Sequence, residues 1–424
     1  MKLLNGIVLM ALLVSCLANA KTERDYFWYR RALQLSDLPK NPQGTGILIA
    51  VTDTGLFRDD RLKETVFLNK AEQFGVLGYD DDGNGYVDDV SGYNFVEKSS
   101  ALFDDDSHGS FVASLINQVA PKATLLPLRV LSKTKGGRDE DIISAIDYAI
   151  RMKARIINFS FARDSASDAL KNVLQKASDN GILLVVASGN DASNNDRLPT
   201  FPCKFDIPTL ICVGSVNEDG SLSNFTNYGR RTVHIAAPGH LVGAPVRGGL
   251  KIDSGTSFAA PLVTGVAALV WSQNPRLTAI QVKKQVLLTA SPSNSVADHI
   301  RSGGVLNAKN ALEQNWSAKV LQALPEFWRQ QTLGISSRDH HQELLRFHRQ
   351  DARALSLKFK KIKLDPGNDF LVLYDKNMKE IEVITGDFDD YWTVPTATDT
   401  LYLLAPKKFT DEEGFFEIDS LSAL

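Results

Sequence analysis

The stretch of sequence that decides the fold is DSGTSFAAPLVTGVAALV, at residues 253–270. Its second half is almost entirely apolar, which predicts a helix that is buried on all sides. Pro261 suits the first turn of that helix, and Gly255 permits a tight approach of the chain just before it. Ser257 therefore lies at the predicted helix N-terminus, where unpaired backbone N–H groups can stabilise a developing oxyanion.

Short apolar runs recur along the chain before this helix. They do not alternate apolar with polar residues, and such runs are typical of strands covered on both faces, as in a parallel sheet. Between two of them, residues 139–152 place apolar side chains at helical spacing behind an acidic start. Because strands and helices alternate, we predict an α/β fold with a mostly parallel sheet flanked by helices. The runs lie at residues 47–51, 125–130, 156–159, 182–187, 210–213 and 233–236.

The pattern changes after about residue 315. Residues 316–349 look mixed and partly helical, and strand-like runs separated by turns rich in Asp, Gly and Asn follow them as far as Ile418. The apolar alternation within residues 355–364 changes phase, which predicts a bulge near Lys360 and Lys361. We therefore expect one domain at residues 21–315 and, within residues 316–424, a small all-β sandwich. The 47 Lys and Arg residues against 50 Asp and Glu give a net charge of −3, so we expect no nucleic-acid partner.

The N-terminus has the pattern of a signal peptide. An apolar run is followed by Ala18-Asn19-Ala20, a small-x-small cleavage pattern, so we expect residues 1–20 to be removed. The segment from Leu13 to Cys16 also resembles a bacterial lipobox, which would leave a lipid anchor on Cys16. Both alternatives predict export: a secreted or periplasmic protein in the first case, and a membrane-anchored lipoprotein in the second.

Two cysteines follow this segment, Cys203 and Cys212. An exported protein meets an oxidising compartment, and apolar segments flank a turn between the two residues, so we predict a disulfide between them. Two separate buried thiols are the alternative.

Three more motifs carry side chains that could do chemistry. Asp53 ends an apolar run, Asn190 follows another, and His108 stands just before an apolar, helix-like run. Ligands of open α/β sheets collect at the carboxyl ends of the strands. Taken singly, each of the three residues also fits a purely structural role: Asp53 as an acid in a turn, Asn190 as a loop amide and His108 as a hydrogen-bonded histidine.

Together the four motifs resemble the subtilase family, with catalytic residues in the chain order Asp, His, Ser. The resemblance covers roughly residues 44–290. It implies that Asp53 orients the imidazole, that His108 acts as general base and then general acid, and that Ser257 is acylated. Asn190 and the Ser257 N–H would form the oxyanion hole. The function implied is that of an exported serine endopeptidase acting on proteins or peptides.

The resemblance also implies substrate-binding residues. Ser160 and Phe161 would pair with the substrate backbone, and Gly136 falls where an opposing strand is expected. Ser188 and Gly189 resemble part of the wall of the first specificity pocket.

Three features depart from the family pattern. Ser110-Phe111 replaces the usual Thr-His after the histidine and glycine, and Phe258 replaces the commoner methionine after the nucleophile. We expect these two changes to alter packing rather than proton transfer. Residues 21–45 are too few for the independently folded propeptide that many relatives carry.

The run DDDGNGYVD, at residues 80–88, matches the first part of a calcium loop, with oxygen donors at Asp80, Asp82, Asn84 and Asp88. Ser91 stands where such a loop has its bidentate glutamate. A structural Ca²⁺ site and an acidic surface turn are therefore both open, and the predicted chemistry itself requires no cofactor.

Other functions remain as alternatives. Asp53-Thr54-Gly55 and Asp253-Ser254-Gly255 imitate the paired turns of aspartic peptidases, but the predicted helices between them argue against that class. A catalytically silent exported binding protein on a protease scaffold is the non-enzyme alternative. The C-terminal segment resembles a CUB-like β-sandwich, a module that binds proteins or carbohydrates or packs on its neighbour.

Overall fold

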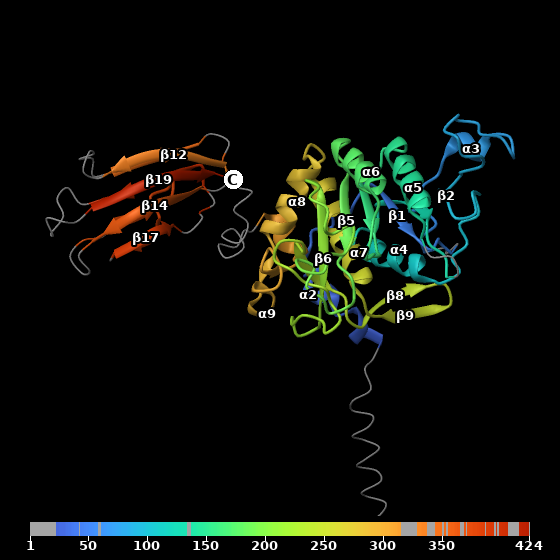
Figure 1. The fold of residues 1–424 in the computed structure, drawn as a ribbon, viewed down its shortest axis with the longest axis horizontal. Helices are drawn as coiled ribbons and strands as arrows, with labels where there is room; N and C mark the ends of the chain where they lie inside the picture. The colour runs from blue at the N-terminus through green and yellow to red at the C-terminus, as the bar shows by residue number, and fades with distance from the viewer. Residues whose placement is uncertain are drawn as a thin grey trace, which may run out of the picture. The chain divides into compact units, whose positions relative to one another are not determined.

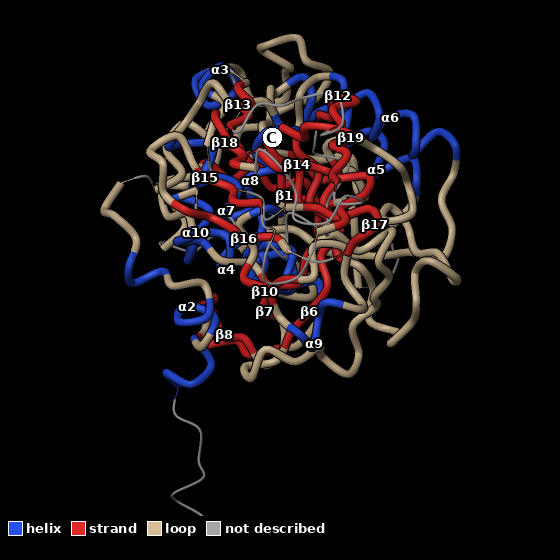
Figure 2. Tube along the Cα trace, turned by 90° about the vertical axis from the view of Figure 1, so that its left-hand side faces the viewer, coloured by secondary structure: helices blue, strands red, loops and turns tan. Residues whose placement is uncertain are grey.

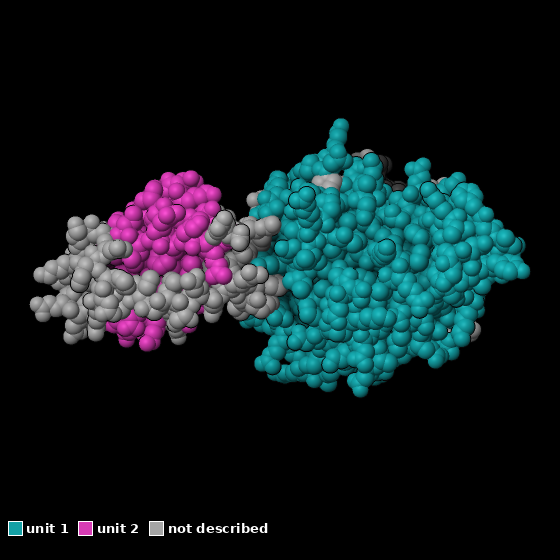
Figure 3. Space-filling model, turned by 90° about the horizontal axis from the view of Figure 1, so that it is seen from above, with its two compact units in different colours: residues 1–315 teal, residues 316–424 magenta. Residues whose placement is uncertain are grey.

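The computed structural model describes residues 23–41, 43–57, 61–133, 137–314, 329–336, 344–349, 352, 355–364, 369, 371–385, 387–393, 396, 398–405 and 415–423. The chain forms two compact units, residues 1–315 and 316–424 (Figure 3). The predicted signal peptide, with Cys16, lies outside the described residues. In the described part of the chain, none of the helices is long and apolar enough to cross a membrane.

The first unit is built on a nine-stranded sheet with the order β10-β11-β7-β6-β5-β4-β1-β3-β2 (Figure 1). Its strand pairs are parallel except β10 with β11, which confirms the predicted sheet type. The central strands are buried along nearly their whole length, as their continuous apolar runs require. The strands are β1 (Leu48–Asp53), β2 (Tyr93–Asn94), β3 (Thr124–Arg129), β4 (Ile156–Phe159), β5 (Leu183–Ala187), β6 (Leu210–Val216), β7 (Ile235–Pro238), β10 (Ser291–Pro292) and β11 (Gly304–Val305).

Helices cover both faces of this sheet. Apolar side chains of α5 and α6 share one core cluster with alternate residues of β3 to β6, and the two helices lie side by side in Figure 1. Helix α7 packs against β4 to β7 and against α4, and it is buried nearly throughout, as predicted. The helices are α3 (Lys70–Phe74), α4 (His108–Val119), α5 (Asp139–Arg151), α6 (Asp168–Asp179), α7 (Thr256–Gln273), α8 (Ala279–Leu288), α9 (Asn294–Ala297) and α10 (Ala308–Glu313).

A hairpin that the sequence analysis did not predict precedes α7. Strands β8 (Val242–Val246) and β9 (Gly249–Asp253) pair in antiparallel register. The N-terminal segment packs here: η1 (Glu23–Phe27) contacts β8, and α2 (Tyr29–Ala32) follows η1 along the chain (Figure 2). Trp28, Tyr29 and Leu33 are buried, so α2 and the residues that flank it belong to the core of the unit. The following η2 (Leu35–Asp37) has no buried residue.

The predicted disulfide is confirmed. Cys203 and Cys212 are bonded, with their Cα atoms 5.3 Å apart. Cys212 lies on β6, whereas Cys203 belongs to the loop between β5 and β6. The bond therefore fixes that loop to the sheet.

The second unit consists of two four-stranded antiparallel sheets, β12-β19-β14-β17 and β13-β18-β15-β16. Both sheets contribute to one apolar core, which makes the unit a sandwich. The bulge predicted near Lys360 appears as a register shift between Phe359 and Lys361. The strands are β12 (Arg329–Ser336), β13 (Leu344–His348), β14 (Leu355–Lys363), β15 (Leu371–Tyr374), β16 (Glu380–Ile384), β17 (Asp387–Trp392), β18 (Thr400–Leu404) and β19 (Phe415–Ala423).

Candidate active site

Asp53 and His108 form a hydrogen-bonded pair at the carboxyl edge of the sheet. Asp53 is the last residue of β1 and is 1% exposed, and its Oδ1 lies 2.7 Å from Nδ1 of His108 at the start of α4. Because a carboxylate only accepts, Nδ1 carries the proton and Nε2 is left as the acceptor. This tautomer is the one that a general base needs.

The surroundings of His108 favour its protonated form. Burial lowers the pKa of the imidazole, but the charge of Asp53 and its hydrogen bond more than offset burial. Lys251 opposes protonation and Asp106 supports it, and the net result is a pKa above the ordinary value for histidine. An imidazolium formed during a reaction is therefore stabilised where it arises.

Asp104 fixes the start of helix α4. Its Oδ1 accepts from the backbone N–H of Ser107 and from Oγ1 of Thr54, each at 2.8 Å, and its Oδ2 accepts from both N and Oγ of Ser110. Burial alone would raise the pKa of Asp104, but the bonds from Ser110 and Thr54 outweigh it and hold the pKa below its ordinary value. The sequence pattern could not predict this role of Asp104, because the groups that donate to its carboxylate come from two separate segments.

Ser257 and Asn190 meet at the start of α7. Ser257 is half-buried in the first helical turn, where backbone N–H groups have no acceptor within the helix. Oδ1 of Asn190 accepts from both N and Oγ1 of Thr256 at 2.9 Å. Because the amide oxygen is held in this way, the amide nitrogen is the end of Asn190 that can donate to a bound oxyanion. Thr256 is thus a positioning residue that the sequence analysis missed.

Two of the departures from the family pattern are in contact with each other. The rings of Phe111 and Phe258 lie 4.8 Å apart, and the Phe258 ring lies 5.2 Å from the imidazole of His108. Phe258 directly follows Ser257, so this contact brings the helix starts of α4 and α7 together. The two aromatic residues form one packed unit beside the histidine.

A hollow of about 210 Å³ lies beside Ser257. Gly189, Asn190 and Ser257 line it, together with residues that the sequence analysis did not single out. We call it the Ser257 pocket. The other lining residues are Ala162, Arg163, Asp164, Asp191, Thr200 and Thr256.

The remaining predicted substrate residues lie close to this pocket or outside the described part. Ser160 is buried and accepts from Asn158, and the half-buried Phe161 packs against Phe159 just before Ala162. Ser188 is buried behind Gly189 and donates to the carbonyl of Asn227. Gly136 lies outside the described residues.

The acidic loop gathers carboxylates, but not in the expected set. Oxygens of Glu72, Asp80 and Asp82 lie within 4.8 Å of one another. Glu72, on α3, was not predicted because it lies eight residues before the motif. Asp88 instead accepts from the N–H of Gly78, and Asn84 donates to Asp82 and Asp89.

An Asp–His pair and a serine at a helix start, at one edge of a parallel sheet, define an α/β protein with the parts of an Asp–His–Ser triad. The model of the subtilase family matches residues 44–328. The chain therefore belongs to the subtilase family.

Individual relatives agree with this assignment. Subtilisin-like protease 1 of Plasmodium berghei (strain Anka) is 31% identical over 304 residues, covering 64% of this chain and 50% of that protein. Subtilisin NAT of Bacillus subtilis subsp. natto is 34% identical over 212 residues, covering 47% of this chain and 55% of that protein. The chain thus spans about half the length of these relatives. The crystal structure of a cold adapted subtilisin-like serine proteinase matches with a TM-score of 0.50 and 31% identity, covering 63% of this chain and 89% of that chain.

Proposed function

We propose that this chain is an exported serine endopeptidase that hydrolyses peptide bonds through an acyl-enzyme on Ser257. The observation that carries the proposal is the 2.7 Å bond between Asp53 Oδ1 and His108 Nδ1, which leaves Nε2 as a base. The contact of His108 with Phe258 supports placing that base beside Ser257.

The reaction follows from this geometry. Nε2 of His108 takes the proton of Ser257 as Oγ attacks the substrate carbonyl carbon. The resulting oxyanion receives hydrogen bonds from the Ser257 N–H and the Asn190 side chain. The tetrahedral intermediate then breaks its C–N bond, and His108 gives its proton to the leaving amine. Water, deprotonated by His108, releases the acyl group in the reverse sequence of proton transfers.

The test uses a fluorophosphonate probe and a peptide substrate on the mature protein. We expect labelling of Ser257 and its loss in Ser257→Ala, with hydrolysis falling by about 10⁴-fold or more. Asn190→Leu should lower kcat by about 10²–10³-fold with little change in KM. Equal labelling of the wild type and Ser257→Ala would refute the proposal and favour a catalytically silent binding protein.

The export proposal rests on the N-terminal sequence. Mass spectrometry of the mature N-terminus distinguishes a free Lys21 from a diacylglyceryl Cys16, and an intact Met1 in exported protein would contradict both. Binding of protein or carbohydrate by residues 316–424 stays a prediction.

We also propose that the acidic loop holds a structural Ca²⁺ ion. The support is the convergence of Glu72, Asp80 and Asp82, because hard oxygen ligands suit this ion. Calcium should raise the melting temperature, and Glu72→Gln should remove the rise. An unchanged melting temperature after chelation would refute the proposed Ca²⁺ site.

A further inference from the structure

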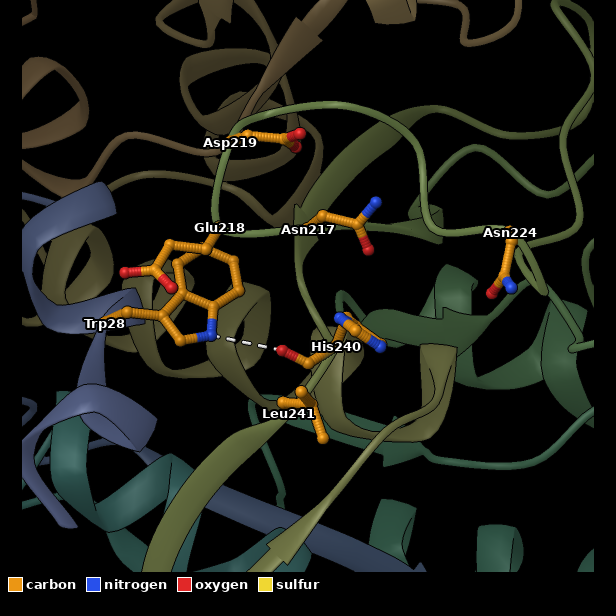
Figure 4. Close-up of a pocket in the computed structure, with 7 residues that line it drawn as sticks. All are labelled: Trp28, Asn217, Glu218, Asp219, Asn224, His240 and Leu241. Atoms are coloured by element: carbon orange, nitrogen blue, oxygen red, sulfur yellow. Dashed lines mark hydrogen bonds between the residues drawn. The ribbon is translucent and has the colours of Figure 1, made fainter. Parts of the chain in front are cut away.

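A second hollow, of about 440 Å³, lies at the same edge of the sheet as the Ser257 pocket. Three segments supply its walls: the residue before α2, the loop after β6 and the loop between β7 and β8 (Figure 4). We call it the β6–β7 hollow. Its lining residues are Trp28, Asn217, Glu218, Asp219, Asn224, His240 and Leu241.

The sheet order places the two hollows next to each other. The Ser257 pocket uses residues that follow β4 and β5, and the β6–β7 hollow uses residues that follow β6 and β7. These strands are neighbours in the order β7-β6-β5-β4. All four are parallel, so their carboxyl ends meet at one edge.

The segment that carries the nucleophile connects the two hollows. On one side, Thr256 bonds to Asn190 in the Ser257 pocket. On the other side, the N–H of Gly255 donates to the carbonyl of Gly239 at 2.8 Å, and the N–H of Leu241 donates to Ser254 at 2.8 Å. A Cβ at Gly239 would lie 2.8 Å from the carbonyl oxygen of Gly255, so glycine is needed for this approach.

A peptide that is cleaved by Ser257 extends from the site in two directions, one on each side of the scissile bond. With the acyl-side residue in the Ser257 pocket, the opposite direction along the sheet edge leads past Gly255 and Gly239 to the β6–β7 hollow. The hollow is therefore placed to receive the leaving-group side of the substrate.

The lining of the hollow is acidic. Glu218 and Asp219 bring two carboxylates, and hydrogen bonds from Ser221 hold the pKa of Asp219 below its ordinary value. Glu218 pairs with Arg31 at 2.8 Å, but the two side chains are 43% and 70% exposed, and ion pairs between exposed side chains contribute little to stability. A substrate cation can therefore replace Arg31 at little cost.

The floor and the polar groups also suit a long cationic side chain. Trp28 lines the hollow although it is almost fully buried, and its indole N–H donates to the carbonyl of His240 at 3.1 Å (Figure 4). The amide nitrogen of Asn217 donates to Ser221 and to the carbonyl of Leu222, which orients its oxygen as an acceptor. Acceptors around an apolar floor match the stem and head of Lys or Arg.

We propose that the β6–β7 hollow is a subsite that binds a Lys or Arg side chain on the leaving-group side of the scissile bond. This inference rests on the proposed peptidase function. It names a substrate class for that function: peptides with a basic residue shortly after the cleaved bond.

The experiment compares internally quenched peptides with one common acyl side. Lys, Met or Glu stands in turn at the second, third and fourth residue after the scissile bond, and Met serves as the uncharged side chain of similar length. At one position, the mature wild type should show kcat/KM about fivefold higher for Lys than for Met, with Glu lowest. The preference should shrink as salt is added.

Variants decide whether the hollow is the cause. The Lys-to-Met ratio should fall to about one in E218Q/D219N, and E218K/D219K should prefer Glu to Lys. The control Asp168→Asn, an exposed acid in the first turn of α6, should keep the wild-type ratio. Equal rates for Lys and Met in the wild type at every position, or an unchanged ratio in E218Q/D219N, would overturn the proposal.

The experiment distinguishes a failure of the proposed peptidase function from a failure of the proposed subsite. Cleavage of the Met peptide by the wild type but not by Ser257→Ala supports the peptidase function whatever the charge preference. If the wild type cleaves none of the peptides, the function and the subsite are both rejected.

Discussion

The two units of the chain use their buried polar side chains differently. In the first unit, Asp53 and Asp104 are almost fully buried, and Oδ1 of each accepts a hydrogen bond from the start of α4, from His108 and from the N–H of Ser107 respectively. In the second unit, buried hydroxyls serve the strands: Ser356 donates to the carbonyl of Thr393, and Thr393 accepts from the N–H of Leu357. Burying a charge is costly unless it is well bonded. The second unit also buries an acid, Asp369, so what distinguishes the first unit is that two of its buried acids hold the start of one helix.

The largest effect that would sharpen this contrast is expected from Asp104→Asn. The amide would turn one of the two acceptor ends into a donor that faces the donors of Ser110 or Ser107, leaving buried groups unpaired. We expect a loss of about 3–5 kcal/mol in the free energy of unfolding of the first unit and a lower kcat. Denaturant unfolding and kinetics measure both, with Asp168→Asn, at an exposed site on α6, as control. An Asp104→Asn protein as stable and active as Asp168→Asn would contradict the assigned role.

A change of similar size in the second unit should leave catalysis untouched. Phe359 is fully buried, and its ring lies 6.0 Å from that of Phe416. Phe359→Ala should cost about 3–5 kcal/mol of that unit's stability, while kcat/KM on a short peptide stays at the wild-type value. Calorimetry resolves the change, and Phe388→Ala, at a partly exposed site, is the control. A parallel fall in activity would break the contrast between the units.

A smaller effect tests the aromatic pair beside the histidine. Because Phe111 and Phe258 are in contact, we expect the two changes to leucine to couple by about 0.5–1.5 kcal/mol in a double-mutant cycle of unfolding free energies. Additive losses would show that the two departures from the family pattern are independent.

The smallest effect concerns pH. Burial lowers the pKa of the His108 imidazole, and Asp53 raises it more strongly. Lys251, whose Nζ donates to Ser107 next to His108, carries a positive charge that lowers this pKa further. Lys251→Met removes a cation, so the pKa of His108 should rise and the acid limb of kcat/KM should move to higher pH. The exposed Lys171→Met on α6 is the control. A shift toward lower pH would refute the sign of this interaction.

The sequence predicted the parts of the site that stand at the ends of regular elements. Asp53, Asn190 and Ser257 were recognisable because each lies where an apolar run ends or begins. The sandwich strands were predicted from short runs and turns, but the described parts of residues 316–349 are strands, not the partly helical structure expected. Their pairing with β18 and β19 decides their conformation, and local patterning does not encode such partners.

The unpredicted parts of the site depend on contacts between distant segments. Thr256 gains its role from Asn190, which lies 66 residues away in the chain. Glu72 joins the acidic loop from a separate helix, and Lys251 reaches His108 from a hairpin without a strong sequence signal. Spacing rules act within one element, so they cannot reveal these partners.

The disulfide makes one wall of the Ser257 pocket depend on the redox conditions of the compartment in which the chain folds. Thr200, a pocket residue, is followed by Phe201, which bonds to Arg163 of the opposite wall, and Cys203 then anchors this segment to β6. In a reducing cytosol the anchor does not form. Under the proposed export, this wall of the pocket is therefore secured only after the chain has left the cytosol, so the proposed peptidase activity would be completed away from cytosolic proteins.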